Sequence, residues 1–456
     1  MGHVFISAAH KSSGKTTLTL GLAAALVRRG LAVQTFKKGP DYIDPMWLGL
    51  ASGRPCRNLD FHMMSRDEIR ASFARHGGAV DVSLIEGNKG LYDGLDLHGS
   101  NSNAALAALL GSPVVLVIDA RGMTRGIAPL ILGYQAFDRS IRIAGVILNN
   151  LGGARHEQKL RAVIAHYTDA EVIGAVPQDD RIAIDERHLG LVPSNEASAS
   201  AEIVAAVRER VEESVDLDRL LAIAASAAPL PAAPQPSSTR PAGKRLRVGI
   251  ARDAAFGFYY ADDLDALGEA GAELVPLDML HAGRLPALDA LVIGGGFPEE
   301  RMRELEANEA LRHDLARAID GGLPVYAECG GLMYLARSIS WQGETARMVG
   351  ALPGDALMHA RPVGRGYARL AGTGEASWLP GTPGEEIAAH EFHYASLENL
   401  PQGLRYAWRV TRGYGVDGAH DGIVRDNVLA SFCHLRGAGE RGWVRPFVEF
   451  ARRQAS

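Results

Sequence analysis

A loop of small residues and lysine near the N-terminus constrains the fold of this chain most strongly. Residues 9–16, AHKSSGKT, follow a short β-branched run and open a predicted helix. A strand, a loop ending in Gly-Lys-Thr and a helix together form a phosphate-binding loop, whose backbone N–H groups and helix N-terminus face phosphate oxygens. We therefore expect a phosphate-loop α/β domain here. The simpler alternative is a glycine-rich turn before a serine-capped helix.

Short β-branched runs alternate with longer amphipathic stretches along the chain, which is typical of parallel α/β layering. In the N-terminal half the expected strands are 3–7, 32–36, 82–85, 114–118, 144–148 and 171–173, and the expected helices are 15–29, 103–110 and 156–166. In the C-terminal half we expect strands at 247–251, 273–276, 290–293 and 324–327 and helices at 262–270 and 309–320.

One segment has a different composition. Residues 225–244 are rich in proline, alanine and serine and poor in large apolar side chains, as in a semi-extended linker. A chain of 456 residues is also too long for one ordinary hydrophobic core. We therefore expect a phosphate-loop domain over 1–224, a linker over 225–244 and a second α/β domain over 245–456.

Charge and cysteine content exclude several classes of protein. A net charge of −5 argues against a nucleic-acid partner. Three cysteines cannot form a disulfide framework, and their odd number suggests a reducing compartment. The apolar runs are too short to span a membrane and no signal peptide is recognisable, so we expect a cytoplasmic protein without membrane or nucleic-acid partners.

The loop residues have separate expected roles in binding ATP. Lys15 pairs with the β- and γ-phosphates, and Thr16 binds Mg²⁺ through its hydroxyl. Glu86 ends a buried strand, where a carboxylate can complete the Mg²⁺ site, or alternatively lie in a solvated turn. The other loop residues expected to contact the nucleotide are Ser12, Ser13, Gly14 and Thr17.

A second charged loop directly follows the second expected strand. It places Lys37, Lys38, Asp41 and Asp44 around a Gly-Pro turn. A rigid turn with surface charges is the plain interpretation. Because the loop lies close to the phosphate site, these charges also suit an anionic substrate held together with a metal ion.

These motifs together carry a specific resemblance. The sequence looks like the cobyrinic acid a,c-diamide synthase family in FKKGPDYIDP (36–45), IEGNKGLYDG (85–94), VVLVIDARGMTR (114–125), AECGGLMYL (327–335) and HEFHY (390–394). The resemblance implies an N-terminal half like dethiobiotin synthetase and a C-terminal half like class I glutamine amidotransferases. It also implies a homodimer that uses L-glutamine and ATP with Mg²⁺ to amidate the a and c acetates of a carboxylated tetrapyrrole.

The resemblance assigns roles to single residues. Asp41, Tyr42 and Asp44 fall in the family's substrate and catalytic loop, with Asp44 also expected at the metal. Glu86 and Asp93 match acidic residues near Mg²⁺ and the reacting carboxylate. Asn149 matches the residue that reads adenine in the dethiobiotin synthetase branch.

Two lysines depart from the family pattern. Lys38 stands where a cysteine is common, and Lys89 follows Glu86 where a methionine is common. With Lys37 and Tyr42 they are the expected substrate-binding side chains. The residues at these positions also resemble those of a branch of the family that amidates sirohaem. The identity of the tetrapyrrole ring therefore stays open.

A cysteine on a sharp turn indicates a nucleophile in the C-terminal half. Cys329 stands between an expected strand and two glycines, and such an elbow exposes the sulfur at a helix N-terminus, which favours its thiolate form. The alternative is a cysteine buried in the core. Gly295 and Gly296, at the end of another strand, can present backbone N–H groups as an oxyanion hole.

Three histidines compete as the base that activates this nucleophile. His434 follows an apolar strand near the chain end and is preferred over His390 and His393, which are interpreted as packing and glutamine-pocket residues. The usual carboxylate two residues after the histidine is absent, because Arg436 stands there. Cys433 is interpreted as a core residue.

Two other functions share some of these sequence features. A phosphate loop after the first strand also occurs in partitioning and regulatory ATPases, but these carry a lysine where this chain has His10, and they need no Cys329 elbow. Cobyric acid synthase shares both domain types, yet the GPDYIDP loop fits the a,c-diamide group better. The expected function is therefore amidation through an acyl phosphate, with ammonia released from glutamine at Cys329.

Overall fold

The computed structural model describes residues 2–179, 182, 186–187, 190–196, 199–229, 245–379 and 383–455. The chain divides into two compact units, Met1–Pro236 and Ser237–Ser456, which are considered separately below. Of the linker expected at 225–244, Ala225 ends helix α8 and residues 230–244 lie outside the described residues.

The N-terminal unit is built on a seven-stranded sheet with the order β3-β2-β4-β1-β5-β6-β7. Every neighbouring pair is parallel, which confirms the expected fold class. The strands are β1 (Gly2–Ala8), β2 (Val33–Lys38), β3 (Arg57–Leu59), β4 (Val82–Glu86), β5 (Val114–Asp119), β6 (Ile143–Leu151) and β7 (Val172–Pro177). A small separate hairpin pairs β8 (Glu186–Arg187) with β9 (Gly190–Leu191).

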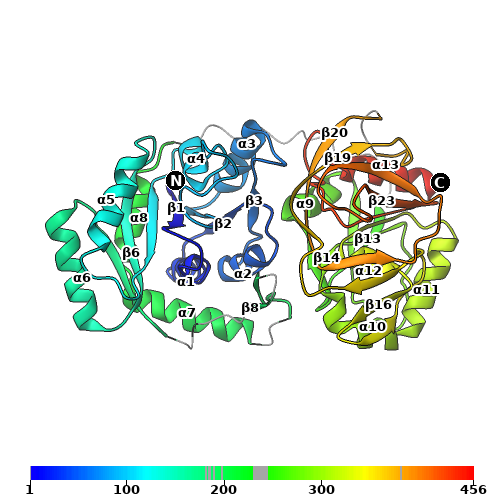
Figure 1. The fold of residues 1–456 in the computed structure, drawn as a ribbon, viewed down its shortest axis with the longest axis horizontal. Helices are drawn as coiled ribbons and strands as arrows, with labels where there is room; N and C mark the ends of the chain where they lie inside the picture. The colour runs from blue at the N-terminus through cyan, green and yellow to red at the C-terminus, as the bar shows by residue number, and fades with distance from the viewer. Residues whose placement is uncertain are drawn as a thin grey trace. The chain divides into compact units, whose positions relative to one another are not determined.

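Helices cover both faces of this sheet. In Figure 1, α1, α2 and α7 lie below the strands and α3 and α4 above them. Gly21 lets α1 approach α7 closely, because a Cβ there would come within 2.5 Å of a Val211 methyl group. The helices are α1 (Lys15–Arg28), α2 (Ile43–Ser52), α3 (Arg66–Gly77), α4 (Asn103–Leu110), α5 (Ile127–Phe137), α6 (Ala154–Tyr167), α7 (Ser200–Ser214) and α8 (Leu217–Ala225).

The C-terminal unit has a nine-stranded mixed sheet with the order β12-β10-β13-β15-β24-β23-β22-β19-β20. The part from β12 to β24 is parallel, and the part from β24 to β20 is antiparallel. Its strands are β10 (Leu246–Ala251), β12 (Ala272–Leu277), β13 (Ala290–Ile293), β15 (Val325–Glu328), β19 (Gly364–Gly372), β20 (Glu386–His393), β22 (Arg405–Arg412), β23 (His420–Arg425) and β24 (Val428–Ser431).

Smaller sheets and helices complete this unit. A four-stranded sheet contains β16 (Ser338–Trp341), β17 (Glu344–Arg347), β18 (Asp355–Met358) and β21 (Ala395–Glu398), and β11 (Phe256–Phe258) pairs with β14 (Gly295–Gly296). The helices are α9 (Ala261–Glu269), the 3-10 turn η2 (Pro298–Arg301), α10 (Met302–Ala307), α11 (Glu309–Asp320), α12 (Gly330–Leu335) and α13 (Val444–Gln454).

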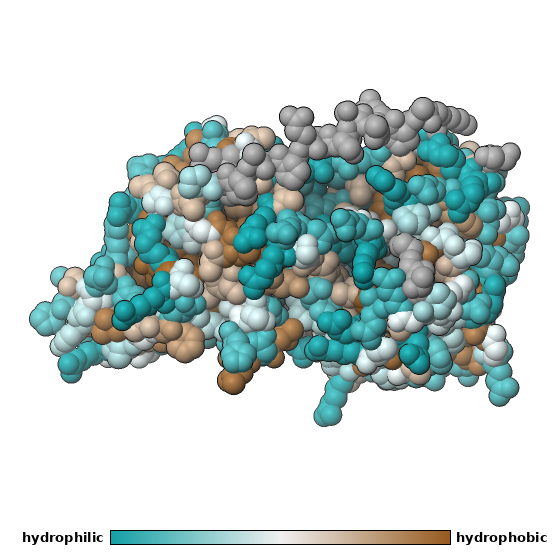
Figure 2. All heavy atoms as spheres, turned by 90° about the horizontal axis from the view of Figure 1, so that it is seen from above, coloured by the Kyte–Doolittle hydropathy of each residue, from teal (hydrophilic) through white to brown (hydrophobic). Residues whose placement is uncertain are grey.

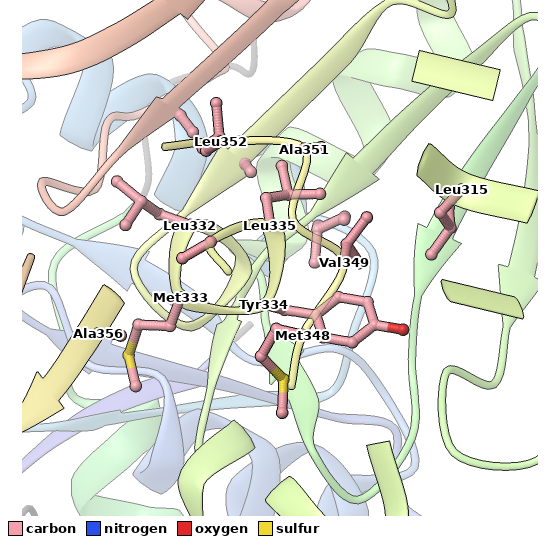
Figure 3. Packing of buried hydrophobic residues seen from close by; sticks show 14 of the residues in the cluster. Leu315, Leu332, Met333, Tyr334, Leu335, Met348, Val349, Ala351, Leu352 and Ala356 are labelled. Atoms are coloured by element: carbon pink, nitrogen blue, oxygen red, sulfur yellow. The ribbon is translucent and has the colours of Figure 1, made fainter. Parts of the chain in front are cut away.

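Side-chain alternation along the central strands gives this unit two cores. Leu291 and Ile293 belong to one cluster, whereas Ala290 and Val292 of the same strand belong to the other, as expected for a sheet buried on both faces. Figure 3 shows the first cluster, in which Leu332 and Leu335 of α12 pack among apolar residues of the segment that follows β17. This packing anchors the helix that directly follows Cys329.

The predicted strands and helices all fall on observed elements. The sequence analysis missed the small four-stranded sheet and the antiparallel strands of the C-terminal unit, together with β3, β8, β9, α2, α3, α5, α7, α8, α10 and α13. On the face shown in Figure 2, hydrophilic side chains predominate and hydrophobic ones form small groups. Among the described residues, no helix has the length and apolar character needed to cross a membrane.

Candidate active sites

The phosphate-binding loop joins β1 to α1 in a conformation that depends on Gly14. This residue has φ 83°, and a Cβ on it would lie 2.2 Å from Nδ2 of Asn149. Ser13 is buried, and its hydroxyl donates to the His10 carbonyl over 2.7 Å. Only glycine therefore fits at the turn into the helix.

Asn149 reaches this loop from the carboxyl end of β6. Its Nδ2 donates to the Ser13 carbonyl over 2.9 Å. This contact fixes the backbone of the loop, a role that the sequence analysis did not assign to Asn149. Adenine recognition by the same residue stays a prediction.

Lys15 lies at the start of α1 with only 8% of its surface exposed. Burial and the neighbouring Lys37 ammonium lower the pKa of Lys15 to about 8, against the pull of Glu86, Asp44 and Asp93. Thr16 follows, and its hydroxyl donates to Oε1 of Glu86 over 2.8 Å. Thr17 is the next residue of the same helix.

A buried lysine lies at the centre of the acidic residues. Nζ of Lys37 is 2.5 Å from Oδ2 of Asp44 and 2.7 Å from Oε1 of Glu86. Burial alone would lower the pKa of Lys37, but Asp44 and Glu86 hold it well above its usual value. Burial raises the pKa of Glu86 against the opposing effect of Lys37, whereas for Asp44 the Lys37 contact outweighs burial and lowers the pKa. The site thus holds a cation among oxygen donors.

Asp41 shapes the start of α2, where the sequence analysis expected only a turn. Its Oδ1 accepts from the backbone N–H groups of Ile43 and Asp44 over 3.0 and 3.2 Å. Its other carboxylate oxygen lies 3.9 Å from Nζ of Lys37. Burial and the adjacent Asp44 charge raise the pKa of Asp41 to about 7. Tyr42, the N-cap residue of α2, is buried.

The loop after β4 is held by Asn103, a residue that the sequence analysis did not assign to the site. Its Nδ2 donates to the carbonyls of Asn88 and Gly90 over 2.6 and 2.8 Å, and its Oδ1 accepts from Asn88 N–H. Asp93 closes the loop by accepting from Gly90 N–H over 2.9 Å. The one feature of the sequence that could have identified Asn103 was its position in the first turn of an expected helix.

The two lysines that depart from the family pattern have different surroundings. Lys38 ends β2 and is 7% exposed, and burial lowers its pKa to about 8 although Asp60 acts to raise it. Lys89 is exposed, with φ 52°. Lys38 is therefore not a solvated surface lysine, whereas Lys89 is exposed.

In the C-terminal unit, Cys329 occupies a strained elbow between β15 and α12. Its backbone has φ 48° and ψ −102°, which a non-glycine residue rarely adopts. The sharp turn needs close packing, because a Cβ on Gly331 would lie 2.2 Å from the Ile293 carbonyl oxygen. Cys329 is buried, with 8% of its surface exposed, although the sequence analysis expected the elbow to expose the sulfur.

His434 is the histidine that contacts Cys329. It follows β24, and its backbone N–H and C=O are paired with those of His390 over 2.7 and 3.1 Å. The two rings stack with centroids 4.9 Å apart. Burial acts to lower the pKa of His434, but side-chain hydrogen bonds with Cys329 and Glu328 raise it to about 10.

The carboxylate beside His434 is Glu328, which the sequence analysis did not consider. Nδ1 of His434 lies 3.1 Å from Oε2 of Glu328, the residue directly before Cys329. Arg436, two residues after His434, donates from Nη1 to the Ala438 carbonyl. The Glu-Cys dipeptide at the elbow was the feature of the sequence that could have identified Glu328.

The other candidate histidine is placed elsewhere. Nδ1 of His393 donates to the Ala395 carbonyl over 2.7 Å, and the ring stacks on Phe432 with centroids 4.2 Å apart. Its Nε2 is 3.4 Å from a carboxylate oxygen of Glu391. Cys433 is fully buried in the hydrophobic cluster, where burial and the nearby Asp421 charge raise its thiol pKa well above the usual value.

The two glycines of β14 lie against the elbow. A Cβ on Gly295 would be 2.8 Å from Cε1 of His434, and a Cβ on Gly296 would be 2.0 Å from the Ala255 carbonyl oxygen. A Cβ on Gly330 would in turn be 3.1 Å from the Gly296 backbone nitrogen. No side chain fits at these positions, so backbone groups border the Cys329 elbow.

Comparison with known proteins gives a consistent match for each unit. Residues 5–192 match the family model described as the CobQ/CobB/MinD/ParA nucleotide binding domain. Residues 247–441 match the model of the CobB/CobQ-like glutamine amidotransferase domain.

Relatives match almost the whole chain. A protein of Magnetococcus marinus named cobyrinate a,c-diamide synthase is 47% identical and covers 99% of this chain and 98% of its own. Proteins of the same name from Methanosarcina acetivorans and Archaeoglobus fulgidus are 42% and 40% identical, covering 98% and 99% of this chain and 95% and 98% of their own.

Proposed function

Because the chain belongs to the cobyrinate a,c-diamide synthase family, we propose that it amidates the a and c acetate groups of a tetrapyrrole. It is a glutamine-hydrolysing amide ligase with a nucleotide-binding domain. The observation that carries the proposal is the contact between Cys329 and His434 on a strained elbow, in a chain whose other unit holds Lys15 beside Asp44 and Glu86.

The first half-reaction is glutamine hydrolysis at Cys329. The thiol gives its proton to His434, and the sulfur attacks the side-chain amide carbon of glutamine. His434 returns the proton to the departing nitrogen, so that ammonia leaves and a thioester remains. Water then hydrolyses the thioester to glutamate and restores the thiol. Backbone N–H groups near Gly296 are proposed to stabilise the oxyanion.

The second half-reaction is activation of the acetate at the phosphate-binding loop. The acetate oxygen attacks the γ-phosphorus of ATP, forming an acyl phosphate and ADP. Ammonia attacks the acyl carbon and phosphate leaves, which gives the amide. Lys15 is buried beside a second lysine, so an anionic phosphate in the loop is attracted by both ammonium groups. Asp41, with a pKa of about 7, suits the removal of the proton from the attacking nitrogen.

The donors around Lys37 fit a Mg²⁺ ion. The Thr16 hydroxyl, Asp44 and Glu86 are oxygen ligands of the kind that Mg²⁺ prefers, and Asp44 and Glu86 already hold one cation, the Lys37 ammonium. Within the described ranges no group of three or more His, Cys, Asp or Glu side chains forms a metal cage. That suits an ion completed by phosphate oxygens and water. When bound, Mg²⁺ would neutralise charge on the phosphates.

The ring is proposed to be cobyrinate or hydrogenobyrinate, with sirohaem as the alternative that Lys89 favours. The test is a substrate panel in which each ring is incubated with ATP, Mg²⁺ and glutamine. Mass spectrometry then counts the added amides. Two amides on a corrin ring support the proposal, two on sirohaem alone support the alternative, and none on any ring contradicts both.

A further inference from the structure

The side chain of Glu328 is held in one orientation at the end of β15. Oε1 accepts from the Tyr326 hydroxyl over 2.6 Å and from the Leu435 backbone N–H over 3.0 Å. Oε2 lies 3.1 Å from Nδ1 of His434. Glu328 is 7% exposed, so water competes little for these contacts. Each carboxylate oxygen therefore has its own partners.

The partners of Oε1 are themselves fixed. Tyr326 is fully buried and stacks on Trp443 with ring centroids 4.0 Å apart. Burial and the Glu328 charge hold the Tyr326 pKa well above its usual value, so its hydroxyl keeps its proton and donates. Leu435 directly follows His434, so its N–H belongs to the same fixed segment. Oε1 thus has only donors facing it.

The contact with Oε2 determines the tautomer of His434. An ionised carboxylate oxygen can only accept, so Nδ1 of His434 carries a proton. This leaves Nε2 for the hydrogen bond between His434 and Cys329. In this tautomer His434 takes the thiol proton at Nε2 and becomes the imidazolium that its raised pKa favours, whereas the opposite tautomer cannot accept the proton there.

We propose that Glu328 is the positioning residue of the glutamine site, which holds His434 in the productive tautomer and compensates the imidazolium charge when Cys329 gives up its proton. The inference rests on the roles proposed above for Cys329 and His434. Glu328 would thereby take the role of the acid that is missing two residues after the histidine.

Other charged groups near His434 are engaged elsewhere. Arg436 lies 3.9 Å from Asp262, and Nη1 donates to the Ala438 carbonyl. The carboxylate of Glu391 accepts from backbone N–H groups of Tyr414 and Gly415 over 2.7 and 3.0 Å. Cys329, Glu328 and the stacked ring of His390 contact the His434 ring.

Glu328→Gln gives a test that separates positioning from packing. The Leu435 N–H can only donate, so the glutamine oxygen takes the place of Oε1 and the NH₂ group faces Nδ1. That arrangement forces His434 into the tautomer with the proton on Nε2, which cannot accept the thiol proton. Glu328→Ala leaves the tautomer unforced. A positioning role predicts that Gln is more damaging than Ala, and a packing role predicts the reverse because Gln preserves volume.

The measurements use the full chain. For Glu328→Gln we expect kcat of glutamine hydrolysis to fall about 100-fold with KM little changed, since a proton transfer is lost. The rate of Cys329 alkylation by iodoacetamide near neutral pH should fall about tenfold or more, because the thiolate forms only with imidazolium beside it. Amidation driven by ammonium should persist. Cys329→Ala identifies the alkylated thiol, and Arg436→Ala should behave as wild type.

Unchanged alkylation in a folded Glu328→Gln variant would overturn the inference, and so would an equal loss of ammonium-driven amidation, which would indicate a damaged fold. If the wild-type chain failed to hydrolyse glutamine, the proposed function would fall. The alkylation comparison would still decide the role of Glu328.

Discussion

The ammonium group of Lys37 lies 2.5 Å from a carboxylate oxygen of Asp44, with less than a fifth of either side chain exposed to solvent. Glu86 shares the same ammonium over 2.7 Å. Buried carboxylates are stable only when a cation or several donors compensate them. Lys37 therefore makes the acidic edge of the phosphate-loop sheet possible before any ligand binds.

Replacing Lys37 should make the N-terminal unit depend on a divalent cation. Lys37→Met leaves Asp44 and Glu86 without their shared cation, which costs about 3–5 kcal/mol of folding free energy. Added Mg²⁺ should restore part of this, because it binds the same oxygens. Thermal denaturation with and without MgCl₂, in the absence of nucleotide, measures the effect. Lys89→Met, on an exposed side chain, is the control, and equal Mg²⁺ shifts in both variants would contradict the interpretation.

Lys15→Ala should separate the two half-reactions. Loss of the ammonium group removes the charge that we propose to face the nucleotide phosphates, so ATP binding measured by calorimetry and ADP release should both disappear. Glutamine hydrolysis should continue, because Cys329 and His434 lie in the other unit. Undiminished ADP release in this variant would remove Lys15 from the proposed site.

Cys329→Ala should abolish glutamine use but retain amidation with high concentrations of ammonium, because only the first half-reaction needs the thiol. His434→Ala should give the same pattern, and Cys433→Ala, at a buried core position, should keep glutamine hydrolysis. Product amide is measured by mass with each nitrogen source. Failure of ammonium to support a folded Cys329→Ala variant would require another role for the cysteine.

Asp41→Asn should stabilise the ligand-free protein in a pH-dependent manner. The pKa of Asp41 is raised from 3.8 to about 7, so its contribution favours folding below pH 3.8 and is lost as the pH rises towards 7. Removing the titrating group should therefore add on the order of 2 kcal/mol at pH 8 and clearly less at pH 5. Chemical denaturation at both pH values tests this, and a gain that is equal at both would show that Asp41 does not titrate as described.

Lys89 and Lys38 should respond differently to substitution. Lys89→Met should raise KM for the tetrapyrrole several-fold and leave KM for ATP unchanged, because its exposed ammonium is free to meet a ring carboxylate. Lys38→Met should instead mainly raise stability near neutral pH, because burial disfavours the Lys38 ammonium more than Asp60 favours it. Steady-state kinetics and thermal denaturation of both variants distinguish these effects, and identical kinetics for Lys89→Met would exclude it from ring recognition.

Local sequence determined the class of fold and the kind of groups at each site. Runs of β-branched residues predict buried strands such as Val114–Asp119. The small residues beside Gly14 and Cys329 predict the two turns. These signals are short-range, because side-chain periodicity and turn geometry depend on neighbouring residues. The antiparallel strands β19, β20 and β22 carried no such signal, since one-sided burial mixes polar and apolar residues.

Only the tertiary structure decided which of these groups meet. His434 and Glu328 are 106 positions apart, and they contact because β15 and β24 are parallel neighbours that end at the same edge. Asn149 and Ser13 are 136 positions apart, and they contact because the order of the strands in the sheet differs from their order in the chain. Sequence fixes which side chains a strand end can offer, but the partner across the sheet depends on strand order and register, which long-range packing sets.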